Sequence, residues 1–141
     1  MMIVPAGPRS GRGRTPSPSG RPMAAGGPGQ PEAIVTGANT GIGLVTAREL
    51  ARRGARVILA ARSAPKGLQA VDAVKEAVGA EAPVQFLRLH PPPFESVRAF
   101  AEGFRALGLP LHMLVLNAGV MACPFGLSAD GFELQIATNH L

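Results

Sequence analysis

The chain has 141 residues, enough for one domain of ordinary size, and 46% of them are hydrophobic, which is sufficient for a buried core. Most of its net charge of +5 is carried by the first 31 residues, which hold four arginines and no acid, whereas residues 32–141 carry ten basic and nine acidic side chains. A body this close to neutrality excludes the basic surface of a nucleic-acid-binding domain.

Residues 1–31 are dominated by Pro, Gly, Ser, Ala and Arg. We expect this tail to be disordered, because it buries too little apolar surface to offset the entropy of ordering. Its arginines, serines and threonines without any acid suit an organellar transit peptide, and a leader without function fits them equally well. The tail therefore leaves the compartment open between an organelle, such as the chloroplast, and the cytoplasm.

From residue 32 onward, short apolar runs alternate with helical patterns. Strands are predicted at residues 33–37, 55–61, 84–89 and 112–119. Helices are predicted from apolar faces formed by Gly43, Ala47, Leu50, Ala51 and Gly54, by Leu68, Val71, Val74 and Val78, by Val97, Phe100, Ala101 and Phe104, and by Leu134, Ala137 and Leu141. Strands that alternate with helices predict an α/β fold with a parallel sheet of about four strands and helices on both faces.

The segment TGANTGIG, residues 36–43, lies where the first strand turns into the first helix. Three glycines, Gly37, Gly41 and Gly43, let the backbone approach a pyrophosphate, and the helix N-terminus offers unpaired N–H groups and a favourable dipole. Because the glycines follow a strand and open a helix within a βαβ unit, a dinucleotide-binding loop is favoured over an ordinary glycine-rich turn.

The second strand ends in Ala60-Ala61-Arg62-Ser63, without the acidic residue that would bind the ribose 2′-hydroxyl of NAD. An arginine there suits a 2′-phosphate, so NADP is favoured over NAD. A solvated arginine at the end of a strand explains Arg62 nearly as well.

Other chemical groups are sparse. The three histidines, at positions 90, 112 and 140, show no metal-ligand spacing, so no metal site is predicted. The single cysteine, Cys123, excludes an internal disulfide and has no neighbour that would activate it. No apolar run approaches the ~20 residues of a transmembrane helix.

TGANTGIG, NAG at residues 117–119 and TNHL at residues 138–141 together resemble the short-chain dehydrogenase/reductase family. The stretches ARELARRGARVILAARS and NAGVMACPFGLSADGFELQIATNHL are similar to its retinol-dehydrogenase-like branch, and most of all to plant members described at the chloroplast inner-envelope translocon. The resemblance implies that residues 32–141 form the N-terminal half of a doubly wound, NAD(P)-binding Rossmann domain, with strand order 3-2-1-4. It also implies oxidoreduction of an alcohol or carbonyl.

The resemblance further implies which residues would form the site. The cofactor would be held by Gly37, Asn39, Thr40, Gly41, Ile42, Gly43, Arg62, Asn117, Ala118 and Gly119. Asn139 matches the proton-relay asparagine of the family's catalytic group of Asn, Ser, Tyr and Lys. Nothing matches the other three, because the chain has no tyrosine and Ser128 precedes Asn139; Ser128 is interpreted as a helix N-cap.

The sequence departs from the family pattern at three places in the cofactor-binding half. His90 stands where the family commonly has an adenine-binding Asp, and three prolines at residues 91–93 replace the usual loop and helix cap. Leu116 replaces the first Asn of the family's NNAG, whose hydrogen bonds tie the sheet together.

The sequence thus predicts a dehydrogenase fragment that keeps an NADP half-site and does not turn over as given. Two alternatives stay open: a non-catalytic nucleotide-binding or interaction module, and an incomplete gene model of an active oxidoreductase. The fourth strand would form an open apolar edge, which predicts aggregation or pairing with a related chain. The last helix would leave an apolar patch.

Overall fold

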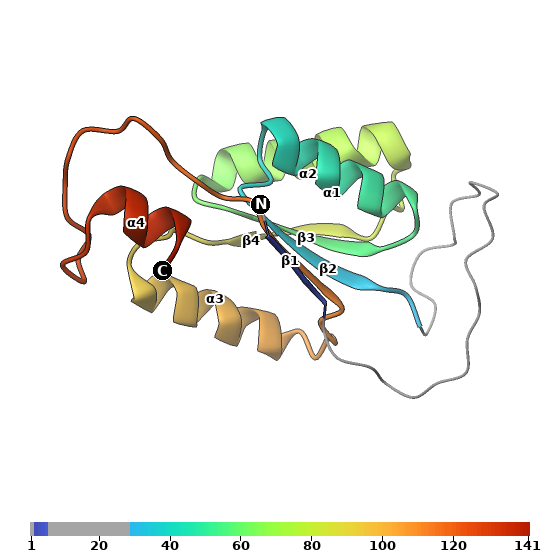
Figure 1. Ribbon diagram of the computed structural model, residues 1–141. Coiled ribbons are helices and arrows are strands. Elements are labelled where there is room, and N and C mark those ends of the chain that lie inside the picture. The colour runs from blue at the N-terminus through green and yellow to red at the C-terminus, as the bar shows by residue number, and fades with distance from the viewer. Residues whose placement is uncertain (1, 6–28) are drawn as a thin grey trace.

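The computed structural model describes residues 2–5 and 29–141, which form five strands and four helices (Figure 1). In chain order they are β1 Met2–Pro5, β2 Glu32–Thr36, α1 Gly41–Arg52, β3 Arg56–Ala61, α2 Ala64–Val78, β4 Val84–Arg88, α3 Phe94–Ala106, β5 Met113–Leu116 and α4 Leu134–Asn139.

The strands form one sheet in the order β1-β5-β2-β3-β4. β2, β3, β4 and β5 are parallel, so their order confirms the predicted 3-2-1-4 arrangement of a truncated doubly wound fold. α1 and α2 cover one face of the sheet and α3 covers the other (Figure 1).

The prediction of an open edge at the fourth parallel strand is wrong. β1 pairs with β5 in antiparallel register, with Met2 opposite Leu116 and Pro5 opposite Met113. Residues 2–5, which the sequence analysis placed in a disordered tail, therefore extend the sheet. The rest of that prediction falls mostly on residues 6–28, which lie outside the described part of the chain.

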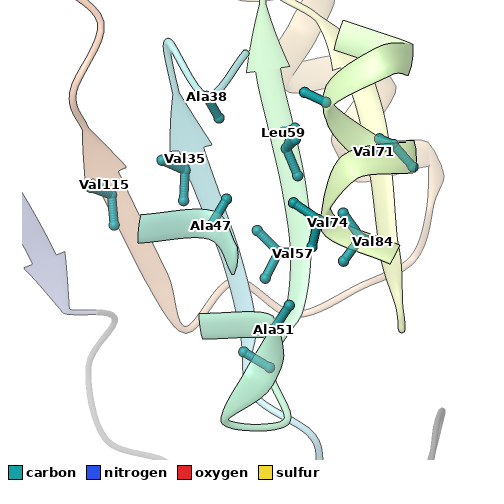
Figure 2. Packing of buried hydrophobic residues seen from close by; sticks show 12 residues of the cluster. Val35, Ala38, Ala47, Ala51, Val57, Leu59, Val71, Val74, Val84 and Val115 are labelled. Carbon is teal, nitrogen blue, oxygen red and sulfur yellow. The ribbon is translucent and has the colours of Figure 1, made fainter. Parts of the chain in front are cut away.

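Alternate residues of the strands feed two hydrophobic clusters, one on each face. Val35, Val57 and Leu59 face α1 and α2, where they meet Ala47 and Val74 (Figure 2). The intervening strand residues join Phe100 and Phe104 of α3 in a second cluster, built with Ile34, Ile58 and Ala60. Burial on both faces explains why these strands read as continuous apolar runs rather than as alternating patterns.

The apolar faces predicted for α1, α2 and α3 match the structure with two exceptions. In α2, Val71 and Val74 are buried as predicted, but Leu68 is 57% exposed. The adjacent Gly67 is buried instead, and a Cβ there would overlap the ring of Phe86 on β4. The missing side chain lets helix and strand approach closely. In α3, Val97 is also largely exposed.

The segment between β5 and α4 is anchored at two points. The Asp130 carboxylate accepts a hydrogen bond from the backbone N–H of Phe94 at 3.0 Å, and the rings of Phe94 and Phe132 lie 5.8 Å apart. Asp130 thereby caps α3, which begins directly after the three prolines.

Ser128 does not cap α4, contrary to the sequence interpretation. The residue before that helix is Glu133, whose carboxylate accepts hydrogen bonds from the backbone N–H groups of Gln135 and Ile136. These two bonds lower the pKa of Glu133. Ser128 closes a local turn by accepting from the Phe132 N–H. Of the apolar face predicted for the last helix, Leu141 is exposed and Ala137 is buried, and Ile136 is exposed beside them.

Candidate functional site

A cavity of about 230 Å³ opens at the carboxyl ends of the parallel strands, the edge at which open α/β sheets bind their ligands. It is bounded by the loop after β2, the end of β3, the segment after β4 and the segment after β5. Its lining residues are Gly37, Asn39, Thr40, Ala60, Ala61, Arg62, Leu89, Pro91, Ala118, Gly119, Val120 and Thr138.

Six of the ten residues expected to hold the cofactor line this cavity. They are Gly37, Asn39, Thr40, Arg62, Ala118 and Gly119. The other four, Gly41, Ile42, Gly43 and Asn117, lie beside it in the glycine loop, in the first turn of α1 and at the end of β5. Six lining residues were not predicted, because apolar and small side chains carry no chemical signal of their own: Ala60, Ala61, Leu89, Pro91, Val120 and Thr138.

Two glycines of the loop have different physical roles. Gly41 has φ +55°, and no protein atom lies within 4 Å of where its Cβ would be. Gly43 is buried at the first turn of α1, and a Cβ there would lie 2.5 Å from both the Asn117 amide nitrogen and the Gly37 carbonyl oxygen. Gly43 thus allows α1 to pack on the strand ends, whereas Gly41 leaves open space at the helix N-terminus, where a phosphate would be favoured.

Thr36 joins the glycine loop to the end of β5. Its hydroxyl oxygen accepts hydrogen bonds from the backbone N–H groups of Asn117 and Ala118, both at 2.9 Å. The Asn117 side-chain amide in turn donates to the Thr36 carbonyl at 3.0 Å. These bonds fix two walls of the cavity to each other, even though Leu116 replaces the asparagine that would add further hydrogen bonds.

The charge at the cavity comes from Arg62, the one ionisable side chain among the described residues that line it. Arg62 follows the last residue of β3 and is exposed. An anionic ligand would therefore meet a cation and no carboxylate at this end of the cavity.

On the side where an adenine-binding Asp was expected, the wall is apolar. Leu89 and Pro91 line the cavity, and His90 between them is exposed, with its backbone N–H donating to the Ser96 hydroxyl at 3.0 Å. The wall can therefore make van der Waals contact with the flat face of a nucleobase, but it has no carboxylate that could accept a hydrogen bond from the base.

Asn139, the one residue matched to the catalytic group, is held by the backbone of Val120. Its amide oxygen accepts from the Val120 N–H at 2.8 Å, and its amide nitrogen donates to the Val120 carbonyl at 2.7 Å. Both ends of the side chain are therefore used to join α4 to the loop that follows Gly119.

A second polar cluster lies at the opposite, amino end of the sheet. Glu32 is buried at the start of β2, with one carboxylate oxygen 3.3 Å from Arg56 and the other without a hydrogen-bond partner among the described residues. Burial raises the pKa of Glu32, and the charges of Arg56 and His112 oppose that shift. The Glu32 N–H donates to Nδ1 of His112 at 3.0 Å, and the His112 N–H donates to the Glu32 carbonyl at 3.1 Å.

Within residues 2–5 and 29–141, none of the helices combines the length and hydropathy needed for a membrane span. The same part of the chain brings together no group of three or more His, Cys, Asp or Glu side chains that could hold a metal ion.

Residues 31–140 match the family model described as short chain dehydrogenase. Retinol dehydrogenase 12 of Bos taurus is 52% identical over 108 residues, which are 77% of this chain and 34% of that protein. The short-chain dehydrogenase TIC 32 B, chloroplastic, of Brassica napus is 46% identical over 109 residues, again 77% of this chain and 34% of the relative. The chain thus spans about a third of the length of these relatives.

Solved structures agree in fold. An uncharacterized protein from Mycobacterium paratuberculosis superposes with a TM-score of 0.64 and 43% identity, over 84% of this chain and 39% of that one. A metagenomic short-chain oxidoreductase in complex with NADP gives a TM-score of 0.58 and 36% identity, over 64% of this chain and 39% of that one.

The parallel sheet with helices on both faces, the glycine loop that opens α1 and the match over residues 31–140 together place this chain in the short-chain dehydrogenase family of NAD(P)-binding oxidoreductases.

Proposed function

We propose that the 141-residue chain binds the adenosine 2′-phosphate half of NADP and does not by itself carry out hydride transfer. The observation that carries this proposal is that Gly37, Asn39, Thr40 and Arg62 line one cavity at the carboxyl edge of the sheet. When bound, the dinucleotide would supply the hydride chemistry; the residues of this chain bind and orient its adenosine end.

The residues present fit such a ligand in three respects. The open space at Gly41 and the N-terminus of α1 suit the pyrophosphate. The apolar wall of Leu89 and Pro91 suits the adenine face. Arg62 supplies positive charge at the end of β3, where the ribose lies in folds of this type. The complex of a 36% identical oxidoreductase with NADP supports the same assignment.

The experiment is a calorimetric titration of the purified chain with NADPH and NADH, in the wild type and in two variants. Arg62→Ala removes the cation at the cavity, and Arg53→Ala removes an exposed cation that does not line it. We expect Arg62→Ala to weaken NADPH binding by about 10- to 100-fold, the value of a charge-assisted hydrogen bond to phosphate. NADH binding should change little, and Arg53→Ala should change neither. Equal losses for both nucleotides would refute the assignment of Arg62.

The absence of turnover is the second half of the proposal. It rests on the composition, because a chain without tyrosine cannot use the tyrosine acid or base of the family. Incubation with NADPH and an aldehyde, retinal among them, should produce no oxidation of the nucleotide above the rate without protein. Steady oxidation by the wild type would contradict this and would point to a different acid.

Two hypotheses, a non-catalytic nucleotide-binding module and an incomplete gene model of an active oxidoreductase, predict different transcripts. If the chain is a nucleotide-binding module, the reading frame stops after Leu141. Reads that continue in frame into a Tyr-x-x-x-Lys segment would identify the whole protein as an active oxidoreductase, and would leave the assignment of the adenosine half-site unchanged.

We also propose that residues 1–31 direct the chain to an organelle. The tail is acid-free and carries four arginines, and a relative at 46% identity is described as chloroplastic. A fluorescent protein fused behind residues 1–31 should accumulate in the organelle, whereas a fusion in which the four arginines are replaced by Gln should stay in the cytoplasm. Equal distribution of the two fusions would dismiss the leader function.

A further inference from the structure

The outer edge of β5 is the position at which a further strand of the sheet would add. In this chain β5 has β2 on its inner side, and β1 lies on its outer side in antiparallel register. β1 is only four residues long, and residues 6–31 connect it to the start of β2. A short strand on such a long connection contributes little free energy, so opening of this edge costs less than opening of the core strands.

β1 and β5 are both four apolar residues long and share Met at the first position and Val at the third. β1 reads Met-Ile-Val-Pro and β5 reads Met-Leu-Val-Leu. In the observed register, Met2 pairs with Leu116, Ile3 with Val115, Val4 with Leu114 and Pro5 with Met113.

A second copy of β5 fits the same edge in the same way. Laid antiparallel, it would pair Met113 with Leu116 and Leu114 with Val115, and each pair would occur twice about a twofold axis. The paired residue types would be those that β1 already provides, except that leucine would replace Pro5 and Ile3. A strand that pairs with itself in this manner forms an isologous interface, the geometry of a closed dimer.

β1 and β5 differ in how readily their outer edges would pair with a further strand. β5 contains four apolar residues and no charge, so an uncovered β5 would be an unprotected pairing edge. β1 ends in Pro5, which lacks an N–H and is a usual device for ending a ladder at an edge strand. β1 therefore covers an edge that invites pairing and replaces it with one that is less suited to it.

We propose that the outer edge of β5 is a self-complementary dimerisation surface, and that β1 occupies it as an intramolecular mimic of β5 from a second copy. The intact chain is then monomeric. Loss of β1, for example by removal of an N-terminal leader, yields a twofold dimer with one sheet running through both copies. Because the two β5 strands are antiparallel, the nucleotide cavities lie at opposite edges of that sheet.

The test uses the full chain. Ile3→Pro with Val4→Pro removes two N–H groups from β1 and leaves β5 unchanged, and Ala24→Pro with Ala25→Pro is the matched control outside β1. In sedimentation velocity over a wide concentration range, the wild type and the control should be monomers, and the β1 variant should show a twofold mass. Adding Leu116→Lys to the β1 variant should restore the monomer, because it charges the edge at a residue that is 39% exposed and outside the core.

A disulfide test provides an independent readout. Residues paired across an antiparallel ladder have Cα atoms about 4.5–5.5 Å apart, within disulfide range. In a Cys123→Ser background, Met2→Cys with Leu116→Cys should oxidise to an intrachain disulfide and run as a monomer. A dimeric band would show that β1 is donated by another copy, and no disulfide would show that β1 does not lie on β5; either result overturns the proposal. So does a β1 variant that stays monomeric with a native circular dichroism spectrum, or one whose association survives Leu116→Lys.

Discussion

The carboxylate of Asp130 caps a helix that begins 36 residues earlier, by accepting the backbone N–H of Phe94 at 3.0 Å. The residue before α3 is Pro93, whose side chain cannot accept a hydrogen bond. The cap that the three prolines removed from the local sequence is therefore supplied by the segment between β5 and α4. The same contact fixes that segment to the start of α3.

Removing this cap should destabilise the fold and loosen the segment. Asp130→Ala should lower the free energy of unfolding by about 1 kcal/mol, the usual effect of losing an N-cap acceptor. Asp130→Asn keeps an acceptor oxygen and should recover most of the loss. Urea denaturation followed by circular dichroism measures both variants, and equal loss in the two would show that the charge, not the hydrogen bond, is responsible.

The Thr36 hydroxyl should contribute more to the free energy of unfolding than a single hydrogen bond does, because it accepts from two backbone N–H groups in a part-buried setting. Thr36→Val keeps the shape and leaves both donors unpaired, which should lower the free energy of unfolding by about 2–4 kcal/mol. Thr36→Ser keeps the hydroxyl and should lower it much less. Thermal and urea unfolding of the two variants give the comparison. Similar stabilities would mean that water replaces the hydroxyl and that Thr36 does not join the two walls.

Two glycine substitutions should separate folding from binding. Gly43→Ala places a Cβ where Asn117 and Gly37 already lie, so it should destabilise the fold and weaken nucleotide binding together. Gly41→Asn adds a side chain in open space, and Asn tolerates the left-handed conformation at φ +55°. It should therefore fold normally and lose nucleotide binding by ten-fold or more, as about 1.4 kcal/mol would give. If the folded Gly41→Asn variant bound nucleotide normally, the assignment of the phosphate site to the space beside Gly41 would be wrong.

Glu32 should make the chain less stable as pH rises. Since burial raises the pKa of Glu32 above its unfolded value of 4.5, the folded chain holds that proton more tightly than the unfolded chain. The resulting stabilisation is fully present below pH 4.5 and is lost as pH rises through the folded pKa. Glu32→Gln does not titrate, so the difference in unfolding free energy between the wild type and this variant should fall with pH across that window. A difference that is flat with pH would contradict a raised pKa.

The sequence predicted the four parallel strands well, because strands buried on both faces appear as uninterrupted apolar runs such as RVILAA in β3. The prediction that Leu68 is buried was wrong. A search for periodic apolar residues favours leucine over glycine, but α2 approaches Phe86 so closely that only Gly67, which has no side chain, fits there. β1 and the Asp130 cap were missed for another reason. Both depend on contacts between segments far apart in the chain, and a four-residue apolar run inside a Pro/Gly-rich tail gives no local indication that it will pair with β5.

Within the site, the meeting of the glycine loop and Arg62 at one cavity was predictable, because the glycines lie where β2 turns into α1 and Arg62 directly follows β3. The apolar wall of Leu89 and Pro91 was not, because only the fold brings the segment after β4 next to the end of β3. Asn139 was matched by motif alone, and its bonds to Val120 show a role in holding the loop that the motif did not indicate.

We propose above that this chain binds the adenosine half of NADP and not the nicotinamide half. The most direct measurement is a calorimetric titration of the full chain with the two halves separately, 2′-phosphoadenosine 5′-phosphate and nicotinamide mononucleotide. We expect saturable binding of the first with an affinity close to that of NADPH, and no binding of the second. Binding of nicotinamide mononucleotide, or failure of a folded chain to bind the adenosine half, would contradict it.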